Sequence, residues 1–207
     1  SAGDRLTSGK HNTLMGHNAG DIINTGNYNT VIGTGAGINI EDGQYNVCIG
    51  GFAQAGSSSQ FVISIGYAAG ESINSANANG TIAIGYSALN ANTSGRYNTA
   101  VGYQALKTNV DGNKNTAIGY QALTTFEPTT DGAGHNTAVG YLAGKEATTA
   151  SGSVFIGEAA GRDVTTGNYN IAIGLNAMYD GTCTGDHNIA IGVHAGDALT
   201  SGIGNVL

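Results

Sequence analysis

The segment NTAVGYQAL (residues 98–106) is followed one repeat later by NTAIGYQAL (residues 115–123). The same pattern recurs throughout the chain, each time around a glycine that we call the register glycine. The basic unit is about 17 residues long, and longer intervals such as that from Gly119 to Gly140 contain loop insertions. Such self-similarity is the signature of a repeat architecture. The eleven register glycines are Gly16, Gly33, Gly50, Gly66, Gly85, Gly102, Gly119, Gly140, Gly157, Gly174 and Gly192.

Each unit contains one short segment with the pattern of a β-strand. Three residues before the register glycine every copy carries a β-branched residue, and one residue before it every copy carries an apolar residue. β-branched residues favour strands, and the alternation with a period of two is that of a strand. A unit of this length is too short for a helical repeat. We therefore predict an all-β fold, a parallel β-solenoid of about eleven rungs, which at about 4.8 Å per rung is roughly 50 Å long.

Both faces of these predicted strands are free of charge. Residues three and one before the register glycine share one face, which we assign to the core of the chain. The residue between them points the opposite way, and we call this position the small-residue column. Because a continuous exposed stripe of small or apolar residues marks an interface, we predict that this column contacts identical chains around a common axis, with a homotrimer preferred. The full column is Leu14, Val31, Cys48, Ser64, Ala83, Ala100, Ala117, Ala138, Phe155, Ala172 and Ala190. Its interface residues are predicted to be Ala83, Ala100, Ala117, Ala138, Ala172 and Ala190.

The polar segments between the strands end in turn-forming residues. Gly26, Gly95 and Gly167 each stand shortly before a predicted strand, and we expect them to supply the positive φ angle of a tight turn. Asn occupies the position four residues before the register glycine in eight of the eleven copies. We expect these side chains to stack and to form hydrogen bonds with their own turn and with neighbouring rungs.

Two features suggest ligand binding. Aromatic rings follow five successive register glycines and predict a ladder along the rod, which either binds sugars or fills space between rungs or chains. The longest loop, residues 124–135, contains Phe126 and Glu127, and an exposed Phe126 would make it a site of specific contact; the alternative is an insertion without function. The members of the ladder, which we call the Tyr ladder, are Tyr67, Tyr86, Tyr103, Tyr120 and Tyr141.

Composition and spacing exclude other classes. With 14 acidic and 7 basic residues the net charge is −7, so we expect no nucleic-acid partner, and no apolar run approaches the roughly 18 residues of a membrane helix, so we expect no membrane insertion. Cys48 and Cys183 would lie roughly 38 Å apart at strand spacing and are predicted to be free, or paired between chains if symmetry joins copies of Cys48. We find no catalytic carboxylate pair and no cofactor motif, so we predict neither enzyme activity nor a cofactor. The histidines lack metal-ligand spacing and are expected at surface turns: His11, His17, His135, His187 and His194.

The residue pattern of the repeat resembles that of known fibre proteins. The segments NTAIG (residues 115–119) and NIAIG (residues 170–174) resemble the Asn-Ser-Val-Ala-Ile-Gly repeats of YadA-like trimeric autotransporter adhesin heads. Residues 98–106 look more like the repeats in tail fibres of bacteriophages and contractile injection systems. The resemblance covers nearly the whole chain and implies a left-handed parallel β-roll that assembles as a homotrimer. It also implies an extracellular or virion-surface fibre that meets a host cell-surface glycan or protein receptor. The adhesin heads have a shorter repeat, so the loops of this chain are longer.

We therefore expect residues 1–207 to form a single repeat domain, a segment of a longer fibre with a structural and adhesive function. The alternative is an ice-binding or carbohydrate-binding solenoid, in which an outward row of threonines would order water. Against it, valine and isoleucine interrupt the row, and the row shares the parity assigned to the core. The row consists of Thr13, Thr30, Thr99, Thr116 and Thr137.

Overall fold

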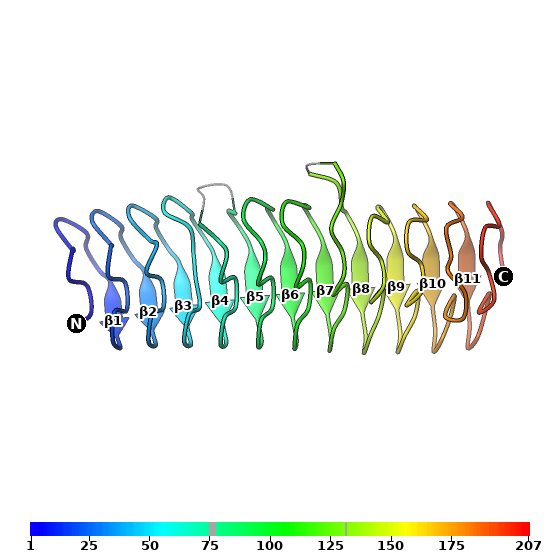
Figure 1. The fold of residues 1–207 in the computed structure, drawn as a ribbon, viewed down its shortest axis with the longest axis horizontal. Coiled ribbons are helices and arrows are strands. Elements are labelled where there is room, and N and C mark those ends of the chain that lie inside the picture. Colours follow the sequence, from blue (N-terminus) through cyan, green and yellow to red (C-terminus); the bar gives the residue numbers. More distant parts are fainter. Residues whose placement is uncertain (75–77, 131) are drawn as a thin grey trace.

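The computed structural model describes residues 1–74, 78–130 and 132–207. Its strands form a parallel β-solenoid in which each turn corresponds to one sequence repeat and contains one short strand, and every strand ends directly before its register glycine. The turns follow one another along a rod (Figure 1). This confirms the predicted all-β solenoid. The strands are β1 (Thr13–Met15), β2 (Thr30–Ile32), β3 (Val47–Ile49), β4 (Ile63–Ile65), β5 (Ile82–Ile84), β6 (Thr99–Val101), β7 (Thr116–Ile118), β8 (Thr137–Val139), β9 (Val154–Ile156), β10 (Ile171–Ile173) and β11 (Ile189–Ile191).

The strands form a single parallel sheet in sequence order. Equivalent residues of successive units pair, as Ala100 of β6 does with Ala117 of β7. The hydrogen bonds between rungs continue beyond the strands: the N–H of Gly102 donates to the carbonyl of Ile84 at 2.8 Å, and that of Leu106 to the carbonyl of Ala122 at 3.0 Å. Backbone groups outside the strands are thus paired with the preceding and following rungs, and equivalent side chains stack in columns along the rod.

The core lies on the opposite side of the sheet from the one predicted. Every member of the small-residue column from Val31 to Ala190 is fully buried within its own chain, and Leu14 is partly buried. The prediction that Ala83, Ala100, Ala117, Ala138, Ala172 and Ala190 contact other chains is therefore wrong, because these residues have no exposed surface. The loop of each rung returns across the inner face of the sheet. The returning loop packs directly against the sheet, and the small side chains of most of the column allow this close approach.

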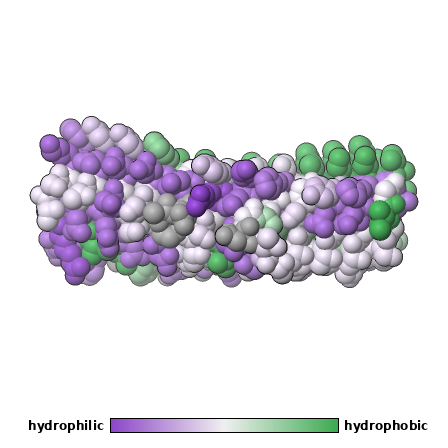
Figure 2. Space-filling model, turned by 90° about the horizontal axis from the view of Figure 1, so that it is seen from above, coloured by the Kyte–Doolittle hydropathy of each residue, from purple (hydrophilic) through white to green (hydrophobic). Residues whose placement is uncertain are grey.

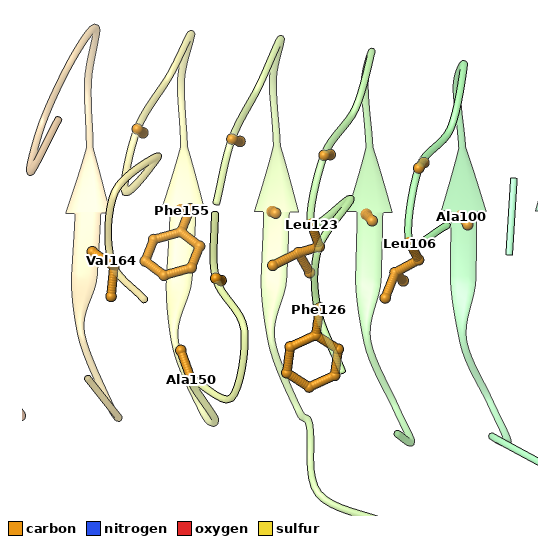
Figure 3. Packing of buried hydrophobic residues seen from close by; sticks show 14 of the residues in the cluster. Ala100, Leu106, Leu123, Phe126, Ala150, Phe155 and Val164 are labelled. Carbon is orange, nitrogen blue, oxygen red and sulfur yellow. The ribbon is translucent and has the colours of Figure 1, made fainter. Parts of the chain in front are cut away.

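Side-chain volumes complement each other across this narrow core. Four of the six rungs with alanine in the small-residue column carry leucine or methionine four residues after the register glycine, as in the pairs Ala100 with Leu106 and Ala117 with Leu123, whereas Val31 faces Gly37. A Cβ added to Gly37 would lie only 3.0 Å from Cγ1 of Val31. Figure 3 shows Leu106, Leu123 and Phe155 filling successive places along the rod. Where a rung combines alanine with glycine, as at Ala138 and Gly144, side chains of the adjacent rungs fill the space: a Cβ on Gly144 would meet Phe155 and Leu123. The core is thus densely packed along the rod.

The residues three and one before the register glycine point away from the core. None of them is fully buried, whereas the central residue of each strand from β2 to β11 is. We call this surface the outer face. It consists of Thr13, Met15, Thr30, Ile32, Val47, Ile49, Ile63, Ile65, Ile82, Ile84, Thr99, Val101, Thr116, Ile118, Thr137, Val139, Val154, Ile156, Ile171, Ile173, Ile189 and Ile191.

The turns that precede the strands differ in one respect from the prediction. Gly26, Gly95 and Gly167 are not in the positive-φ region; the positive φ angle belongs to the residue two positions later, such as Tyr28 (57°) and Tyr97 (56°). Glycine is needed here because of close packing between rungs. A Cβ on Gly95 would lie 2.5 Å from the carbonyl oxygen of the equivalent glycine in the next rung.

The predicted asparagine stack is confirmed. In its middle section the N–H of Asn115 donates to Oδ1 of Asn98 at 2.9 Å, and Nδ2 of Asn98 donates to the carbonyl of Gly112 at 2.7 Å. The same relation continues from Asn115 to Asn136. These amides are buried, so each side chain satisfies polar groups of its own rung and of the neighbouring rungs inside the rod.

Candidate interaction surface

The outer face is a continuous uncharged surface along the sheet. Five of its residues are threonine, and all the others are aliphatic or methionine. At strand spacing it is about 50 Å long and about 10 Å wide, on the order of 500 Å², which is near the upper end of the largest apolar patches on monomeric proteins. Several side chains stay well exposed, among them Met15 (62%), Ile118 (40%) and Ile191 (59%).

Apolar and polar residues are not mixed evenly over the rod. Figure 2 shows the rod from above, where hydrophilic and neutral residues dominate and hydrophobic atoms gather along one edge toward the C-terminal end. Parallel sheets are normally covered on both faces, because both faces carry apolar side chains. Here the loops of the same chain cover one face only. The geometry therefore leaves the outer face available to a partner.

The threonine row lies on the outer face. Thr99, Thr116 and Thr137 stand on three adjacent strands, β6 to β8, and are partly exposed. The expectation that these threonines lie on the same face of the strands as the core residues is thus wrong. Alternation along a strand shows which residues share a face. Because both faces of this sheet are free of charge, the alternation did not show which face is buried.

The Tyr ladder forms as predicted and runs along the rod beside the outer face. Its neighbouring ring centroids are 5.1–5.7 Å apart, with interplanar angles of 7–18°, and each ring is about half exposed. At this separation no sugar ring fits between two tyrosines. Within the ladder only ring edges and hydroxyl groups face solvent, so the rings pack against one another between rungs.

A second set of stacked rings was not recognised from the sequence. It occupies the positive-φ position directly before the Asn stack, where His11, Tyr28, Tyr45 and Phe61 stack in order with centroids 4.7–5.3 Å apart. Tyr169 and His187 form a further pair at 5.1 Å. The repeated aromatic residue at this position is the sequence signal for these contacts.

The longest loop is anchored to the rod at its start. Phe126, predicted to be exposed, is fully buried among core residues, in the place where other rungs carry Ile23, Ile40 or Val164 (Figure 3). The carboxylate of Glu127 accepts a hydrogen bond from the N–H of Val110 at 2.7 Å. Partial burial raises the pKa of Glu127, the hydrogen bond from Val110 opposes this, and the nearby charge of Asp111 adds to the rise. Asp131 of this loop lies outside the described residues.

The five histidines lie at the surface, and the two cysteines lie in the core. His11, His17, His135, His187 and His194 are all exposed, as expected. Both cysteines are free and buried, and because Cys48 has no exposed surface, pairing between copies of Cys48 does not fit this fold. Burial also raises the pKa of Cys48 to about 12. In the part of the chain that the structure describes, no three His, Cys, Asp or Glu side chains are grouped to hold a metal ion.

Over the same described ranges, no helix has the length and apolar character needed to cross a membrane. Comparisons of the chain with protein-family models, with curated proteins and with solved structures gave no match.

Proposed function

We propose that this chain is a structural segment of a fibre, in which copies of the chain assemble side by side through the outer face. The observation that carries this proposal is the apolar outer surface of an eleven-stranded parallel sheet whose other surface is already covered by its own loops. Covering about 500 Å² of such a surface removes apolar side chains from water on every rung.

The repeat favours a second copy of the same chain as the partner. Apolar columns repeat at strand spacing over eleven rungs, with no charged residue among them. Only a partner with the same spacing stays in register over the length of the rod, and an identical chain has this spacing by construction. Identical chains arranged around one axis also form a closed assembly.

The resemblance of the repeats to adhesin heads and tail fibres supports a finer proposal. It favours a left-handed roll, a homotrimer, and a place in an extracellular or virion-surface fibre. Such a segment spaces and presents features that bind a host cell-surface glycan or protein receptor. In this proposal the chain itself is not an enzyme, and its function follows from its length and rigidity.

The absolute mass of the purified chain, measured by light scattering, tests this proposal. A mass near three times 20.7 kDa is expected for the unchanged protein. The double variant Ile84→Glu/Ile118→Glu places charges on the outer face, where Glu remains partly solvated in a single chain, and should yield folded monomers. Thr166→Glu, a matched change at an exposed loop residue, should keep the oligomer. A monomeric unchanged protein would refute the proposal.

One observation favours a second candidate function, an ice-binding surface. The threonines of β6 to β8 lie outward on a regular sheet, so the strongest objection from the sequence is removed. The row is still interrupted elsewhere by valine and isoleucine. A monomer that shows thermal hysteresis, and loses it on Thr116→Leu substitution, would favour this function over the fibre. A monomer without hysteresis would exclude it.

A further inference from the structure

The Tyr ladder places phenol rings of successive rungs closer together than any other tyrosines of this chain except one pair. Ring centroids are 5.7 Å apart for Tyr67 and Tyr86, 5.2 Å for Tyr86 and Tyr103, and 5.1 Å for Tyr103 and Tyr120. The last contact, between Tyr120 and Tyr141, is 5.2 Å. The interplanar angles of 7–18° make the stacking nearly parallel.

The rings are also accessible to solvent. Each is 41–53% exposed, and none belongs to the buried core. Tyr86, Tyr103 and Tyr120 follow one another at the basic interval of the repeat, so the backbone pairing that spaces these rings is the regular pairing of the rod. Small side-chain rotations therefore bring the edges of two neighbouring rings into contact while the backbone stays in place.

We propose that the Tyr ladder is a site of oxidative cross-linking, at which a one-electron oxidant joins tyrosines of adjacent rungs of the same chain into dityrosine. The modification would clamp successive rungs together by covalent bonds parallel to the rod. It depends on the fold of the single chain and holds whether or not chains assemble through the outer face.

A one-electron oxidant removes an electron from each of two neighbouring phenols, and each phenol releases its hydroxyl proton to water, which gives two phenoxyl radicals. The radicals combine through the ring carbons next to the oxygens, and one carbon–carbon bond forms. The hydrogen on each joined carbon leaves as a proton while each oxygen takes up a proton, which restores both phenols. The net change is the loss of two electrons and two protons.

The contacts of the other tyrosines provide internal comparisons. Tyr28 and Tyr45 form one more stacked Tyr–Tyr pair, at 5.1 Å, and should couple in the same way. Tyr169 stacks on His187, and Tyr179 lies under the guanidinium of Arg162, so neither has a tyrosine partner. Coupling should therefore follow adjacency in the fold and not exposure alone.

The test is photo-oxidation of the folded protein with tris(bipyridyl)ruthenium and persulfate, which accepts the electrons and is reduced to sulfate. Tryptic digestion separates Tyr103 (peptide 97–107) from Tyr120 (peptide 115–145). We expect a linked peptide that joins these two segments and has lost two hydrogen atoms, with the cross-link assigned to Tyr103 and Tyr120 by fragmentation. The product should run as a single chain on a denaturing gel.

Two double variants make the test specific. Tyr86→Phe/Tyr120→Phe keeps aromatic stacking but leaves the remaining ladder tyrosines two rungs apart. Because the ladder holds at most two disjoint pairs and Tyr28 with Tyr45 one more, dityrosine fluorescence should fall about threefold, and the linked peptide should disappear. The control Tyr97→Phe/Tyr169→Phe removes equally many tyrosines but no Tyr–Tyr pair, and should leave the yield unchanged.

Three outcomes would overturn the inference. One is an absence of linked peptides in the unchanged protein while its exposed Met15 is oxidised under the same illumination. Another is a yield that drops equally in both double variants. The third is coupling found only between chains, seen as covalent dimers on the denaturing gel. None of these outcomes depends on the mass measured by light scattering, so the inference can fail while the fibre proposal stands, and the reverse.

Discussion

The ring of Phe155 occupies the place that a side chain on Gly161 would take. Phe155 is the bulkiest member of the small-residue column, and a Cβ built on Gly161 would overlap its Cδ1. A Cβ on Gly144, one rung earlier, would also meet this ring. Two glycines of consecutive rungs thus make room for one phenylalanine. In other rungs the volumes are exchanged, since Ala100 faces Leu106.

Gly161→Ala should destabilise the folded chain by about 2–4 kcal/mol, because the added Cβ meets the ring and the residue has φ +61°. Chemical denaturation with the linear extrapolation measures this. Gly51→Ala is the matched control: this glycine is outside the positive-φ region and its Cβ would lie 3.4 Å from Tyr67, so the change should stay within about 0.5 kcal/mol. Equal effects of the two substitutions would contradict the packing argument.

The same pair offers a compensation experiment. Phe155→Ala alone should cost about 3–5 kcal/mol through the cavity it leaves. Phe155→Ala/Gly161→Leu recreates the arrangement of Ala100 and Leu106, and Leu106 has φ 50° at this position, so leucine fits the backbone there. The double variant should be more stable than the sum of the two single changes by at least about 1 kcal/mol in a double-mutant cycle. Strict additivity would show that the two sites are independent.

Ala117→Asp and Ile118→Asp, on neighbouring positions of β7, should have opposite consequences. Ala117 is fully buried and Ile118 is 40% exposed. A carboxylate at position 117 enters a dry core without a partner and should prevent folding, whereas Ile118→Asp should leave the circular dichroism spectrum of the single chain intact. Proteolysis and circular dichroism compare the two. A folded Ala117→Asp protein would reverse the assignment of the inner face.

Asn115→Ala should lower stability by about 2–3 kcal/mol, because Oδ1 of Asn115 accepts the N–H of Asn136 inside the rod. Asn115→Ser should be milder. At the equivalent position Ser153 occurs naturally, and its Oγ accepts the N–H of Asn170 at 3.1 Å. Thermal unfolding of the three proteins should rank them in the order unchanged, serine variant, alanine variant. A reversed order would show that the Asn stack contributes little beyond its shape.

The thiol of Cys48 should make stability fall at high pH. Burial raises its folded-state pKa from 9.0 to about 12, so the unfolded chain loses this proton first as pH rises. Between these two values the unfolded state binds fewer protons, and stability should decrease by up to about 1.4 kcal/mol per pH unit. Below pH 9 the effect is absent. Cys48→Ala, which fits the column, should lose this part of the slope in urea titrations between pH 8 and 11; identical slopes would contradict it.

The sequence predicted several features correctly because they are local. The three-residue strands were located from the pattern before each register glycine, and the Asn stack followed from an amide repeated at the same place. The stacking of the Tyr ladder followed from the constant spacing of about one rung. In each case a repeat of nearly fixed length places equivalent residues above one another, and the hydrogen bonds between rungs maintain that register.

Other features depend on how the loops fold back. The burial of Phe126 and the absence of a positive φ angle at Gly95 arise from contacts between rungs, to which the local pattern does not point. Gly95 looked like a turn residue, but its Cβ is excluded by the next rung and the turn is made at Tyr97. When one rung is considered alone, the need for glycine at such a position is wrongly attributed to the turn.

The sequence by itself determined the repeat, its period, the strand positions and the absence of charge on both faces of the sheet. The tertiary structure decided which of these faces is the inside. Alternation along a strand places Ala117 and Ile118 on opposite faces of the sheet but does not say which face is buried. β-branched residues are suited either to a core or to an interface with a partner. The returning loop packs against the small-residue column, and where it carries a long side chain such as Leu106 or Leu123 only a residue as small as alanine fits opposite. The rows of isoleucine, valine and threonine on either side of this column therefore lie outside.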